Sequence, residues 1–541
     1  MQTTIDARDR NMLLTDYLFR SAVRYPEHEI AVQGKRRITY KALHRRAVEV
    51  GSFLRRERII AFGDRVGVCM ENSPEYLLAY FGILEAGGVV VPISHQTTSR
   101  TMQRLLGDCG TTALFVQVSL LGMVEEALPA IPMLKSVIVA GKRDIEEHRD
   151  GAIPTTLSIA GRTGFHLHEI GSRDGARDGK RTTRGEDLAL ILYTSGTTSE
   201  PKGVMLSHRN LTANAESITE YLGLTSKDRA MLVLPLYYSY GNSLLTTHVT
   251  VGGTLVLENS FVYPNVVIDK MIEERVTGFS GVPSTFAILL NRSKLKDVEF
   301  PALRYVTQAG GPMSPVHAQE LRKALPRTDI YIMYGQTEAT ARLTYLDPGD
   351  LSRKSGSIGK PIPGVTIGIR KPDGSPAVPG ETGEIVAEGE NIMMGYWNRP
   401  EETANVLKGG RLHTGDMARI DDEGFLFIVG RKSEMIKSGA HRISPKEIEE
   451  VILEIPGIHE VAVLGVKDEI MGEVIHAYLV MKENHQPDAK AISSYCRKNL
   501  PPYKVPKMLH FVPSLPKTHS GKVKKHELRG EDATTAWNGS P

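Results

Sequence analysis

Short apolar runs alternate with longer amphipathic segments through the first part of the chain. Apolar runs of about four to eight residues predict buried strands, and apolar residues spaced three and four apart predict helices. This alternation predicts an α/β core of layered helices and sheets. The predicted strands span 65–70, 88–93, 112–116, 136–139 and 188–193, and two predicted helices span 42–55 and 75–84.

Two later regions interrupt this pattern. Residues 141–186 are rich in Gly, Arg, Asp and Thr, which predicts an exposed connection with one strand near 165–170. From 355 to 430, glycines and prolines separate short alternating runs, which is typical of a barrel-like β subdomain. The runs that predict its strands are 365–369, 383–387 and 425–429.

Beyond residue 430 the pattern predicts a small α+β domain. Ser444 and Glu447 have the spacing of a capping box, with a proline in the first helical position, so we expect a helix to begin there. Its apolar face would consist of Ile448, Val451, Ile452 and Ile455. Strands at 461–466 and 475–481, a helix at 489–499 and a frayed end at 531–541 complete the prediction. We therefore divide the chain into an N-terminal domain (1–430), a hinge (431–433) and a C-terminal domain (434–541).

Length and composition limit the function classes. With 541 residues the chain exceeds what one core supports. Its 66 Lys and Arg against 63 Asp and Glu leave a formal charge of only +3, so we expect neither a nucleic acid partner nor an anionic membrane. Three scattered cysteines provide no disulfide framework, and no run reaches the ~20 apolar residues of a membrane span. We expect a cytoplasmic protein.

The most informative stretch is residues 194–203, Thr-Ser-Gly-Thr-Thr-Ser-Glu-Pro-Lys-Gly. Small residues let backbone N–H groups approach an anion, hydroxyls add donors, and Lys202 adds positive charge, which suits a polyphosphate. It differs from the P-loop because Lys202 precedes Gly203 and residues 204–206 predict a second strand. Ser207 would then cap a helix over 210–222. Taken alone, such a loop is more often a polar surface hairpin.

Four further short motifs, which we call islands together with the loop at 194–203, contain candidate functional residues. Tyr334 could stack on a base, Thr337 could donate to a phosphate, and Glu338 could bind Mg²⁺. Asp416 could accept two ribose hydroxyl protons, with Arg431 in support. The other two islands are the bare backbone at Gly310 and Gly311, which could approach a flat ligand, and a glycine-primed loop carrying Lys522. Each island alone has a commoner explanation as a turn or a solvated side chain.

In this order the five islands closely resemble the adenylate-forming superfamily, which includes acyl-CoA and aryl-CoA synthetases, over roughly residues 12–528. Members activate a carboxylate with ATP and Mg²⁺ and pass the acyl group to a thiol such as that of CoA. The resemblance implies that Lys522 is the catalytic lysine, acting with Thr337 and Glu338, and that Glu338 binds the metal. The implied nucleotide-binding set is Thr194, Ser195, Gly196, Thr197, Thr198, Lys202, Gly310, Gly311, Tyr334, Thr337, Asp416, Arg431 and Lys522.

The resemblance also implies a mobile C-terminal domain. Ser433 occupies the hinge position, where members usually carry Asp or Lys, and Ser199 stands where most have glycine. After rotation about the hinge, a second segment would shape the thiol tunnel. Its expected residues are Lys437, Ser438, Gly439 and His441.

The acyl pocket is the least specified site. Its expected lining residues are Tyr238, Gly241, Gly281, Val282, Thr285, Gly310 and Ala339, although the tyrosines around 238 could equally be core packing. Residues 235–247 contain no aspartate to pair a substrate ammonium, which disfavours an amino acid. We expect a fatty acid in preference to an aryl acid. An acyl carrier protein as acceptor, a luciferase-like oxygenase and a non-catalytic nucleotide-binding protein remain as alternatives.

Overall fold

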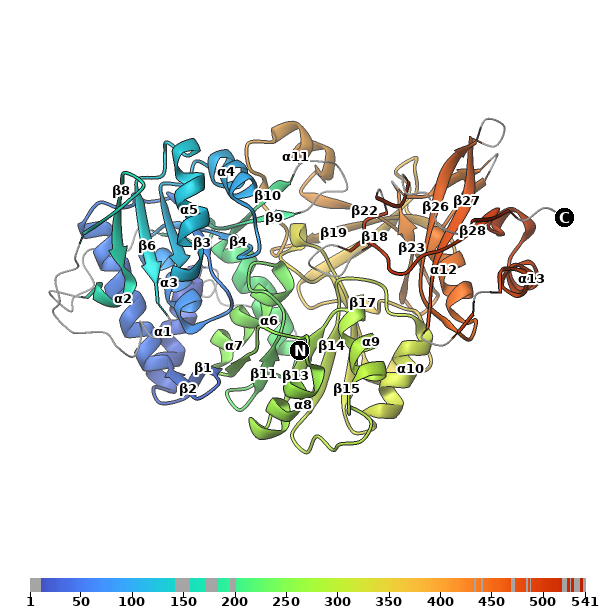
Figure 1. The fold of residues 1–541 in the computed structure, drawn as a ribbon, viewed down its shortest axis with the longest axis horizontal. Helices are drawn as coiled ribbons and strands as arrows, with labels where there is room; N and C mark the ends of the chain where they lie inside the picture. Colours follow the sequence, from blue (N-terminus) through green and yellow to red (C-terminus); the bar gives the residue numbers. More distant parts are fainter. Residues whose placement is uncertain are drawn as a thin grey trace.

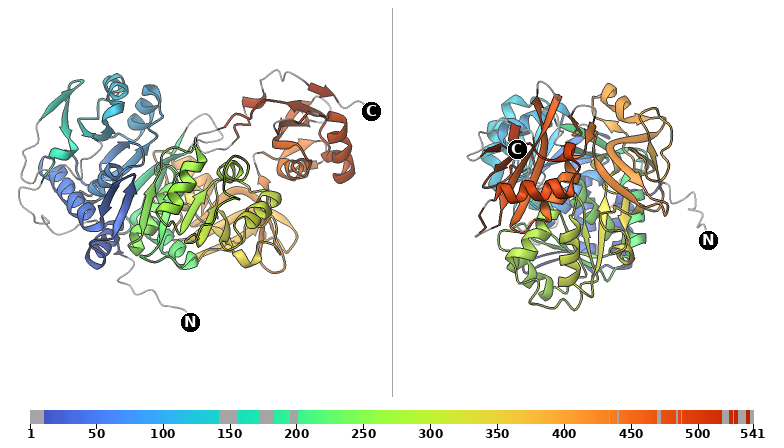
Figure 2. Two further views of the ribbon diagram at one scale, coloured as in Figure 1. Left: turned by 60° about the horizontal axis from the view of Figure 1, so that its bottom comes forward. Right: turned by 90° about the vertical axis from the view of Figure 1, so that its right-hand side faces the viewer.

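A computed structural model gives the arrangement of the chain (Figure 1). It describes residues 11–141, 156–171, 183–194, 201–432, 434–438, 441–468, 472–482, 485–486, 488–517, 523–525, 527–529 and 536–538. Two large sheets and a smaller third sheet form the body. A fourth sheet with two helices forms a domain that stands out from this body, at the right of Figure 1 and the upper right of the left view in Figure 2.

The first large sheet has the strand order β20-β10-β9-β4-β3-β5-β6-β8-β7. Its strands are β3 (Arg65–Cys69), β4 (Val89–Ile93), β5 (Ala113–Gln117), β6 (Ser136–Ala140), β7 (Leu157–Ile159), β8 (Arg162–His166), β9 (Leu188–Thr194), β10 (Lys202–Ser207) and β20 (Gly395–Tyr396). The central strands are parallel, and antiparallel hairpins close both edges. All five strands predicted for this part of the chain are confirmed.

The strand predicted near 165–170 is largely wrong. β8 ends at His166, and Leu167–Glu169 form a 3-10 turn. Leu167 and Ile170 are both fully buried. A spacing of three residues suits a turn of this helix type rather than a strand, in which every second residue faces the same side.

The second large sheet has the order β17-β16-β15-β14-β13-β11-β12-β1-β2. Its strands are β1 (Glu29–Gln33), β2 (Arg36–Thr39), β11 (Arg229–Leu232), β12 (Thr254–Leu257), β13 (Gly278–Gly281), β14 (Tyr305–Gln308), β15 (Asp329–Tyr334), β16 (Thr344–Leu346) and β17 (Lys360–Pro361). The strands from β1 to β15 in this order are parallel. Their carboxyl ends therefore meet at one edge, where ligands of α/β sheets usually bind.

Helices form layers between and outside the two sheets. The shared core combines apolar residues of both sheets with α1 (Leu14–Arg24), α2 (Tyr40–Arg56), α3 (Pro74–Glu85), α6 (His208–Leu222) and α7 (Ser239–Val251). Outer helices α4 (Ser99–Asp108) and α5 (Leu121–Ala127) cover one sheet. Outer helices α8 (Pro264–Glu273), α9 (Pro283–Arg292) and α10 (Pro315–Ala324) cover the other. The layered α/β class is as predicted.

The helix predicted after the polyphosphate-type loop begins two residues early but has the predicted cap. Ser207 Oγ accepts from the Asn210 N–H at 3.1 Å, and the Ser207 N–H donates to Asn210 Oδ1 at 2.8 Å. This reciprocal pair satisfies two N–H groups that a helix start would leave unpaired. It also fixes the end of β10, whose first residue is Lys202.

The third sheet is antiparallel and contains β18 (Val365–Arg370), β19 (Thr382–Gly389), β21 (Leu407–Lys408), β22 (Arg411–Ile420) and β23 (Leu426–Arg431). The three predicted strands are confirmed within a few residues. The long strand β22 was not predicted, because Gly415 and charged residues interrupt its alternation. It carries Asp416, so this residue lies in a strand rather than in a turn. Helix α11 (Pro400–Val406) precedes β21.

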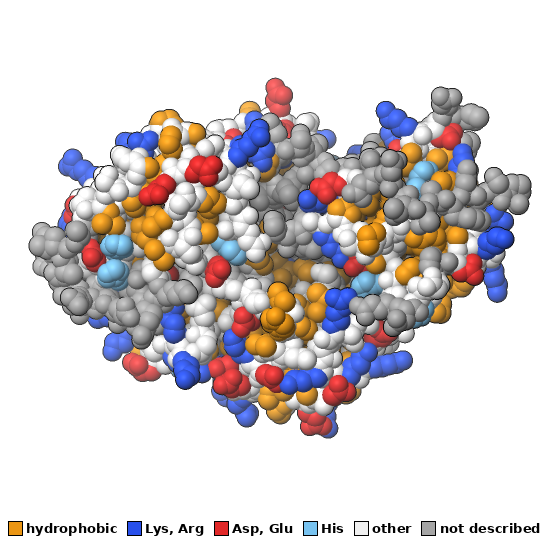
Figure 3. Space-filling view, in the orientation of Figure 1, with side chains coloured by type: hydrophobic (Ala, Val, Ile, Leu, Met, Phe, Trp, Pro, Cys, Tyr) orange, Lys and Arg blue, Asp and Glu red, His pale blue; other side chains and the backbone are white. Residues whose placement is uncertain are grey.

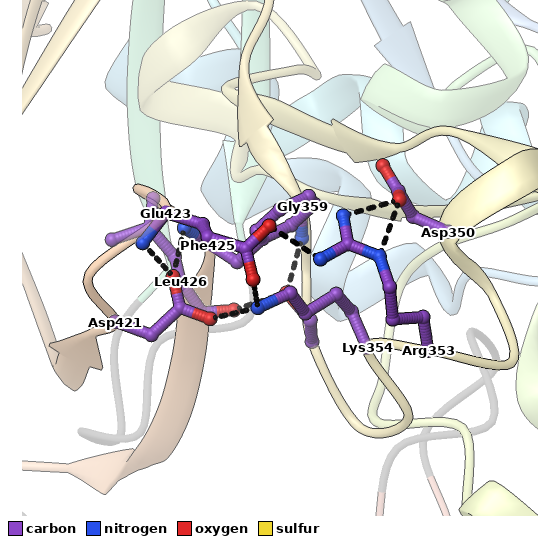
Figure 4. Close-up of polar contacts among 9 residues, drawn as sticks. Asp350, Arg353, Lys354, Gly359, Asp421, Glu423, Phe425 and Leu426 are labelled. Atoms are coloured by element: carbon purple, nitrogen blue, oxygen red, sulfur yellow. Dashed lines mark hydrogen bonds and ion pairs between the residues drawn. The ribbon is translucent and has the colours of Figure 1, made fainter.

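An ion-pair cluster attaches this third sheet to the segment before β17 (Figure 4). Lys354 Nζ contacts Asp421 Oδ2 at 2.7 Å and Glu423 Oε1 at 2.6 Å. Arg353 binds Asp350 at 2.7 Å and also pairs with Glu423. The cluster thus connects the β22–β23 turn with the body.

The C-terminal domain contains β24 (Ile436–Ser438), β25 (His441–Ile443), α12 (Pro445–Leu453), β26 (Ile458–Asp468), β27 (Gly472–Met481), α13 (Ala489–Asn499), β28 (Met508–Phe511) and β29 (Ala536–Asn538). Ser444 caps α12, accepting from the Glu447 N–H at 3.4 Å, but the helix ends before Ile455. Helix α13 has the predicted bounds. The prediction of a frayed end is wrong for 536–538, which pair with β28.

Charged side chains of both signs share the surface (Figure 3), as the small net charge of the sequence suggests. On the face shown in Figure 3, basic and acidic side chains are interspersed and form no single basic area. Cys69, Cys109 and Cys496 are buried free thiols. None of the helices in the described ranges has the length and apolar character needed to cross a bilayer.

Candidate nucleotide and acyl site

Two of the predicted islands, Gly310–Gly311 and Tyr334–Glu338, lie at the carboxyl edge of the second sheet. Gly281, Gln308 and Tyr334 are the last residues of β13, β14 and β15. Gly281 pairs with Gln308, and Gln308 with Ile332, so the three strands end side by side. The segments that follow them therefore lie next to one another, although they are far apart in sequence.

The turn after β14 requires glycine. Gly310 has φ of +86°, and a Cβ there would lie 3.0 Å from Val282 Cγ1. The Gln308 side chain donates to the Gly311 carbonyl at 2.8 Å and holds the turn. Bare backbone is therefore present at the position where a flat base was predicted.

Tyr334, Asp416 and Arg431 form one hydrogen-bonded set. The Tyr334 hydroxyl donates to Asp416 Oδ2 at 2.7 Å, and Arg431 Nε donates to Oδ1 at 3.1 Å. Burial and the nearby Asp416 charge raise the pKa of Tyr334, which therefore stays a donor. Burial opposes the charge on Arg431, but Asp416 and other acids more than offset this and raise its pKa. Each carboxylate oxygen has a second lone pair, so the set still has capacity to accept ribose hydroxyls.

The loop after β15 is rigidly clamped. A Cβ on Gly335 would lie 1.9 Å from the Ala341 carbonyl oxygen, so only glycine fits. Thr340 is left-handed, with φ of +62°, and its hydroxyl donates to the Asn391 carbonyl at 2.6 Å. The Asn391 amide in turn donates to the carbonyl of Ala339 at 3.1 Å. These contacts fix the 3-10 turn Thr337–Ala339.

Glu338 is connected to the predicted phosphate loop through Tyr396, a residue that sequence reasoning missed. The Tyr396 hydroxyl donates to Glu338 Oε1 at 2.8 Å, and Lys202 Nζ lies 5.2 Å from the centre of its ring. Lys202 also pairs with Glu402 and lies opposite Thr194 in the β9–β10 hairpin. In the sequence, the residues Gly-Tyr-Trp at 395–397 were the signal that could have pointed to Tyr396. Ser195, Gly196, Thr197 and Thr198 lie outside the described residues.

Glu338 suits a metal ion held largely by phosphate oxygens. Its Oε2 has no hydrogen-bond partner in the described part of the chain. No cluster of three or more His, Cys, Asp or Glu side chains suitable for a metal occurs among the described residues. One carboxylate oxygen together with substrate phosphates is the usual protein contribution to Mg²⁺ binding.

The predicted acyl pocket borders the same turn. Ser239, the first residue of α7, places its Oγ 3.3 Å from Thr337 Oγ1. Tyr238 is half-buried, with its ring 4.7 Å from that of Tyr237. A Cβ on Gly281 would lie 3.0 Å from Thr285, so these two expected lining residues are in contact.

Two other expected lining residues are buried. Ala339 is fully buried. A Cβ on Gly241 would lie 2.1 Å from the Pro235 carbonyl oxygen, which gives this glycine a packing reason of its own.

The C-terminal residues of the prediction are only partly described. Lys522, Ser433 and Gly439 lie outside the described residues, and His441 belongs to β25. Ser438 is buried opposite Gly472, while Lys437 is exposed. The catalytic lysine, the hinge and the thiol tunnel therefore stay predictions.

The layered body, the clamped carboxylate turn and the added small domain define an enzyme of the adenylate-forming class. The chain belongs to the AMP-binding enzyme family, whose model matches residues 18–397. The model of the AMP-binding enzyme C-terminal domain matches residues 447–522. The resemblance seen in the sequence is thereby confirmed.

Relatives match along nearly the whole chain. A long-chain-fatty-acid–CoA ligase of Escherichia coli O6:H1 is 32% identical, with 97% of this chain and 95% of that protein covered. A feruloyl-CoA synthase of Amycolatopsis sp. is also 32% identical, with 96% and 99% covered. The crystal structure of ATP-bound MatB from Rhodopseudomonas palustris superposes with a TM-score of 0.85 at 28% identity, covering 96% of this chain and 98% of that one.

Proposed function

We propose that this chain is an AMP-forming ligase that activates a carboxylic acid with ATP and transfers the acyl group to the thiol of CoA. The observation that carries this proposal is the continuity of the site. Tyr334, at the end of β15, contacts the Asp416–Arg431 pair, and Glu338, on the clamped turn that follows, is connected through Tyr396 with Lys202 of the predicted phosphate loop. Family membership over both domains supports it.

In the first step a carboxylate oxygen attacks the α-phosphorus of ATP. The bond from that phosphorus to the bridging oxygen breaks, pyrophosphate leaves, and an acyl-AMP forms. Thr337 would donate to the α-phosphate and Lys522 would bridge it and the carboxylate. An ammonium ~4 Å from the developing charge, at an effective dielectric constant of about 20, contributes ~4 kcal/mol before solvation losses. Mg²⁺ bound beside Glu338 would supply further neutralisation of phosphate charge.

In the second step the deprotonated thiol attacks the acyl carbonyl carbon. The carbon–oxygen bond to AMP breaks, and AMP carries away the electron pair. Two steps are needed because a carboxylate would otherwise have to expel oxide, a far poorer leaving group. Rotation about Ser433 would exchange Lys522 for the segment that contains Lys437, Ser438, Gly439 and His441.

We propose a fatty acid in preference to an aryl acid as substrate. No aspartate is present from 235 to 247 to pair an amino group, and glycines at 281, 310 and 311 limit the bulk of the lining. The names of the relatives include both a fatty and an aryl acid.

An exchange screen tests the function directly. Purified protein is incubated with ATP, Mg²⁺ and labelled pyrophosphate together with fatty acids from acetate to octadecanoate, benzoic acids or cinnamic acids. Exchange stimulated by at least one acid is expected, followed by thioester formation with CoA. Thioester formation with acyl carrier proteins alone would make a carrier arm the acceptor. Absence of exchange with every acid would overturn the enzymatic function and favour a non-catalytic nucleotide-binding protein.

A further inference from the structure

Among the buried arginines that the structure describes, Arg342 differs from Arg46 and Arg209 because no described carboxylate pairs with it. Arg46 pairs with Glu49, and Arg209 pairs with Glu390. Arg342 is 3% exposed, and its guanidinium forms no ion pair with any described carboxylate. Leaving a charge buried without a compensating partner is costly.

The contacts that Arg342 does make are with a methionine sulfur, a backbone carbonyl, the ring of Tyr240 and, through a side-chain hydrogen bond, Tyr221. Its Nε contacts Met333 Sδ at 3.2 Å, and its Nη1 contacts the carbonyl of Ala341 at 3.3 Å. The guanidinium carbon lies 4.2 Å from the centre of the Tyr240 ring. A guanidinium has five N–H donors, and these contacts use only part of that capacity.

Arg342 lines a small cavity together with His248. The cavity has a volume of about 20 Å³ and lies between α6, α7 and the strands β13 and β14. His248 also lines it, is 2% exposed, and has no partner for Nε2 in the described part of the chain. Nδ1 of His248 lies 2.9 Å from the carbonyl of Leu244, which requires Nδ1 to donate and leaves Nε2 as an acceptor.

The rest of the cavity wall is partly polar. Ser280 Oγ lies 2.7 Å from Thr307 Oγ1, and the Tyr240 hydroxyl lies 2.8 Å from the same atom. Ser243 also lines the cavity. The apolar part of the wall consists of Ile218, Leu222, Leu224 and Leu244, while the hydroxyls, the guanidinium and the imidazole supply a polar part that suits an oxygen-bearing group.

The cavity lies farther inside the body than the predicted acyl pocket. Residues of the same four segments contribute to both. Ser280 precedes Gly281, Thr307 is three residues before Gly310, and Arg342 is three residues after Ala339. On α7, Ser243 is one helical turn beyond Ser239, which contacts Thr337. These spacings place the cavity roughly 6 to 10 Å from the level of the activated carboxyl group.

Given the proposed ligase function, we propose that the acid substrate carries a second oxygen-bearing group, a hydroxyl or carboxyl on its tail, and that Arg342 binds this group. The tail oxygen would accept from the guanidinium, and a hydroxyl proton would be donated to His248 Nε2. The cavity of about 20 Å³ has the size of one water molecule, and small side-chain movements around it would make room for the tail oxygen and the carbon that carries it. Arg342 is thus proposed as a specificity-determining residue.

The proposal is tested by the ratio of kcat/KM between an oxygen-bearing acid and its plain counterpart, measured with the same protein. Pyrophosphate exchange is measured with octanoate, ω-hydroxyoctanoate and octanedioate, and with cinnamate and p-hydroxycinnamate. In the wild type we expect kcat/KM to be roughly tenfold or more higher for at least one oxygen-bearing acid than for its plain counterpart, as a hydrogen bond to a charged group provides. Arg342→Met should abolish or invert this ratio.

Two further variants separate binding from folding. Arg342→Lys retains the charge and should retain part of the preference. Arg209→Met also removes a buried arginine and should leave the ratio unchanged even where it lowers stability. A wild type that prefers the plain acids, or an unchanged ratio in Arg342→Met, would overturn the inference while leaving the ligase function intact. No exchange with any acid would instead overturn the ligase function itself.

Discussion

The hydroxyl of Tyr396 donates a hydrogen bond to Oε1 of Glu338, 2.8 Å away, across 58 residues of sequence. Tyr396 reaches this position because β20 pairs with β10, the strand that begins at Lys202. Burial and the charge of Glu338 raise the pKa of the tyrosine, so it remains protonated and donates. The carboxylate that we assign to Mg²⁺ is therefore oriented by a neighbour on the phosphate-loop side.

Tyr396→Phe should weaken metal use rather than abolish catalysis. Loss of a group that orients a metal ligand typically costs 10- to 100-fold in metal affinity. We expect the Mg²⁺ concentration for half-maximal pyrophosphate exchange to rise by roughly tenfold, with a smaller change at saturating Mg²⁺. A Mg²⁺ titration of the exchange rate measures this.

Tyr345→Phe is the matched control for that variant. Tyr345 stacks on Tyr221 with ring centres 4.2 Å apart, and its hydroxyl has no hydrogen-bond partner among the described residues. Its Mg²⁺ dependence should equal that of the wild type. Identical titration curves for all three proteins would show that the Tyr396 contact does not support a metal ligand.

Lys522→Ala should separate the two half-reactions. The ammonium is required while charge develops at the α-phosphate, and it is not required when a preformed acyl-AMP reacts with a thiol. We expect loss of pyrophosphate exchange by roughly a thousandfold, with thiolysis of supplied acyl-AMP largely retained. Lys524→Ala, two residues away, removes an ammonium that contacts Glu527 at 2.8 Å and should affect neither step. Equal loss of both half-reactions in Lys522→Ala would contradict the assignment.

Asp416→Asn should reduce affinity for ATP and also destabilise the protein. The change removes the carboxylate that pairs directly with Arg431 and weakens the hydrogen bond from Tyr334. We expect the KM for ATP to rise by roughly tenfold and the free energy of unfolding to fall by about 1 to 3 kcal/mol. Steady-state kinetics and chemical denaturation measure the two effects.

Asp421→Asn provides the comparison for Asp416→Asn. Asp421 pairs with Lys354 in the cluster of Figure 4 and forms no hydrogen bond with Tyr334 or Glu338 among the described residues. Its removal should leave the KM for ATP unchanged. A rise in KM of similar size in both variants would indicate a general loss of structure instead of a nucleotide contact.

The C-terminal domain should lose stability as the pH falls from about 6.5 to about 4. His476 and His510 lie on β27 and β28 with Nδ1 and Nε2 2.9 Å apart. Burial, then His510 and Lys507, lower the pKa of His476 from 6.5 to about 4. Between these values the unfolded chain binds a proton that the folded domain does not, so the stabilisation is complete above 6.5 and is lost on acidification.

Thermal unfolding at pH 7 and pH 5 measures this loss. His476→Gln should reduce the drop in melting temperature between the two conditions by roughly a few degrees. His28→Gln changes an exposed histidine outside the pair and should leave the drop as it is in the wild type. A drop of the same size in His476→Gln and the wild type would refute the role of this pair.

The amino-acid sequence by itself determined the layered α/β class, six of the nine strands of the first sheet (β3, β4, β5, β6, β9 and β10), the caps at Ser207 and Ser444 and the chemistry of the islands. These features depend on residues close together in the chain, where hydrophobic period and capping chemistry are decisive. Strand β22 was missed because Gly415 interrupts its alternation, and the turn at Leu167 was taken for a strand because short apolar runs suit both.

Only the tertiary structure decided which distant residues meet. Parallel pairing of β13, β14 and β15 brings Gly310 beside Val282, and pairing of β10 with β20 brings Tyr396 to Glu338. In the sequence, nothing distinguishes Arg342 from the other basic residues. That it pairs with no carboxylate in the described part of the chain, and that it lines a cavity, results from the packing of two helices on two strands, which no local pattern encodes.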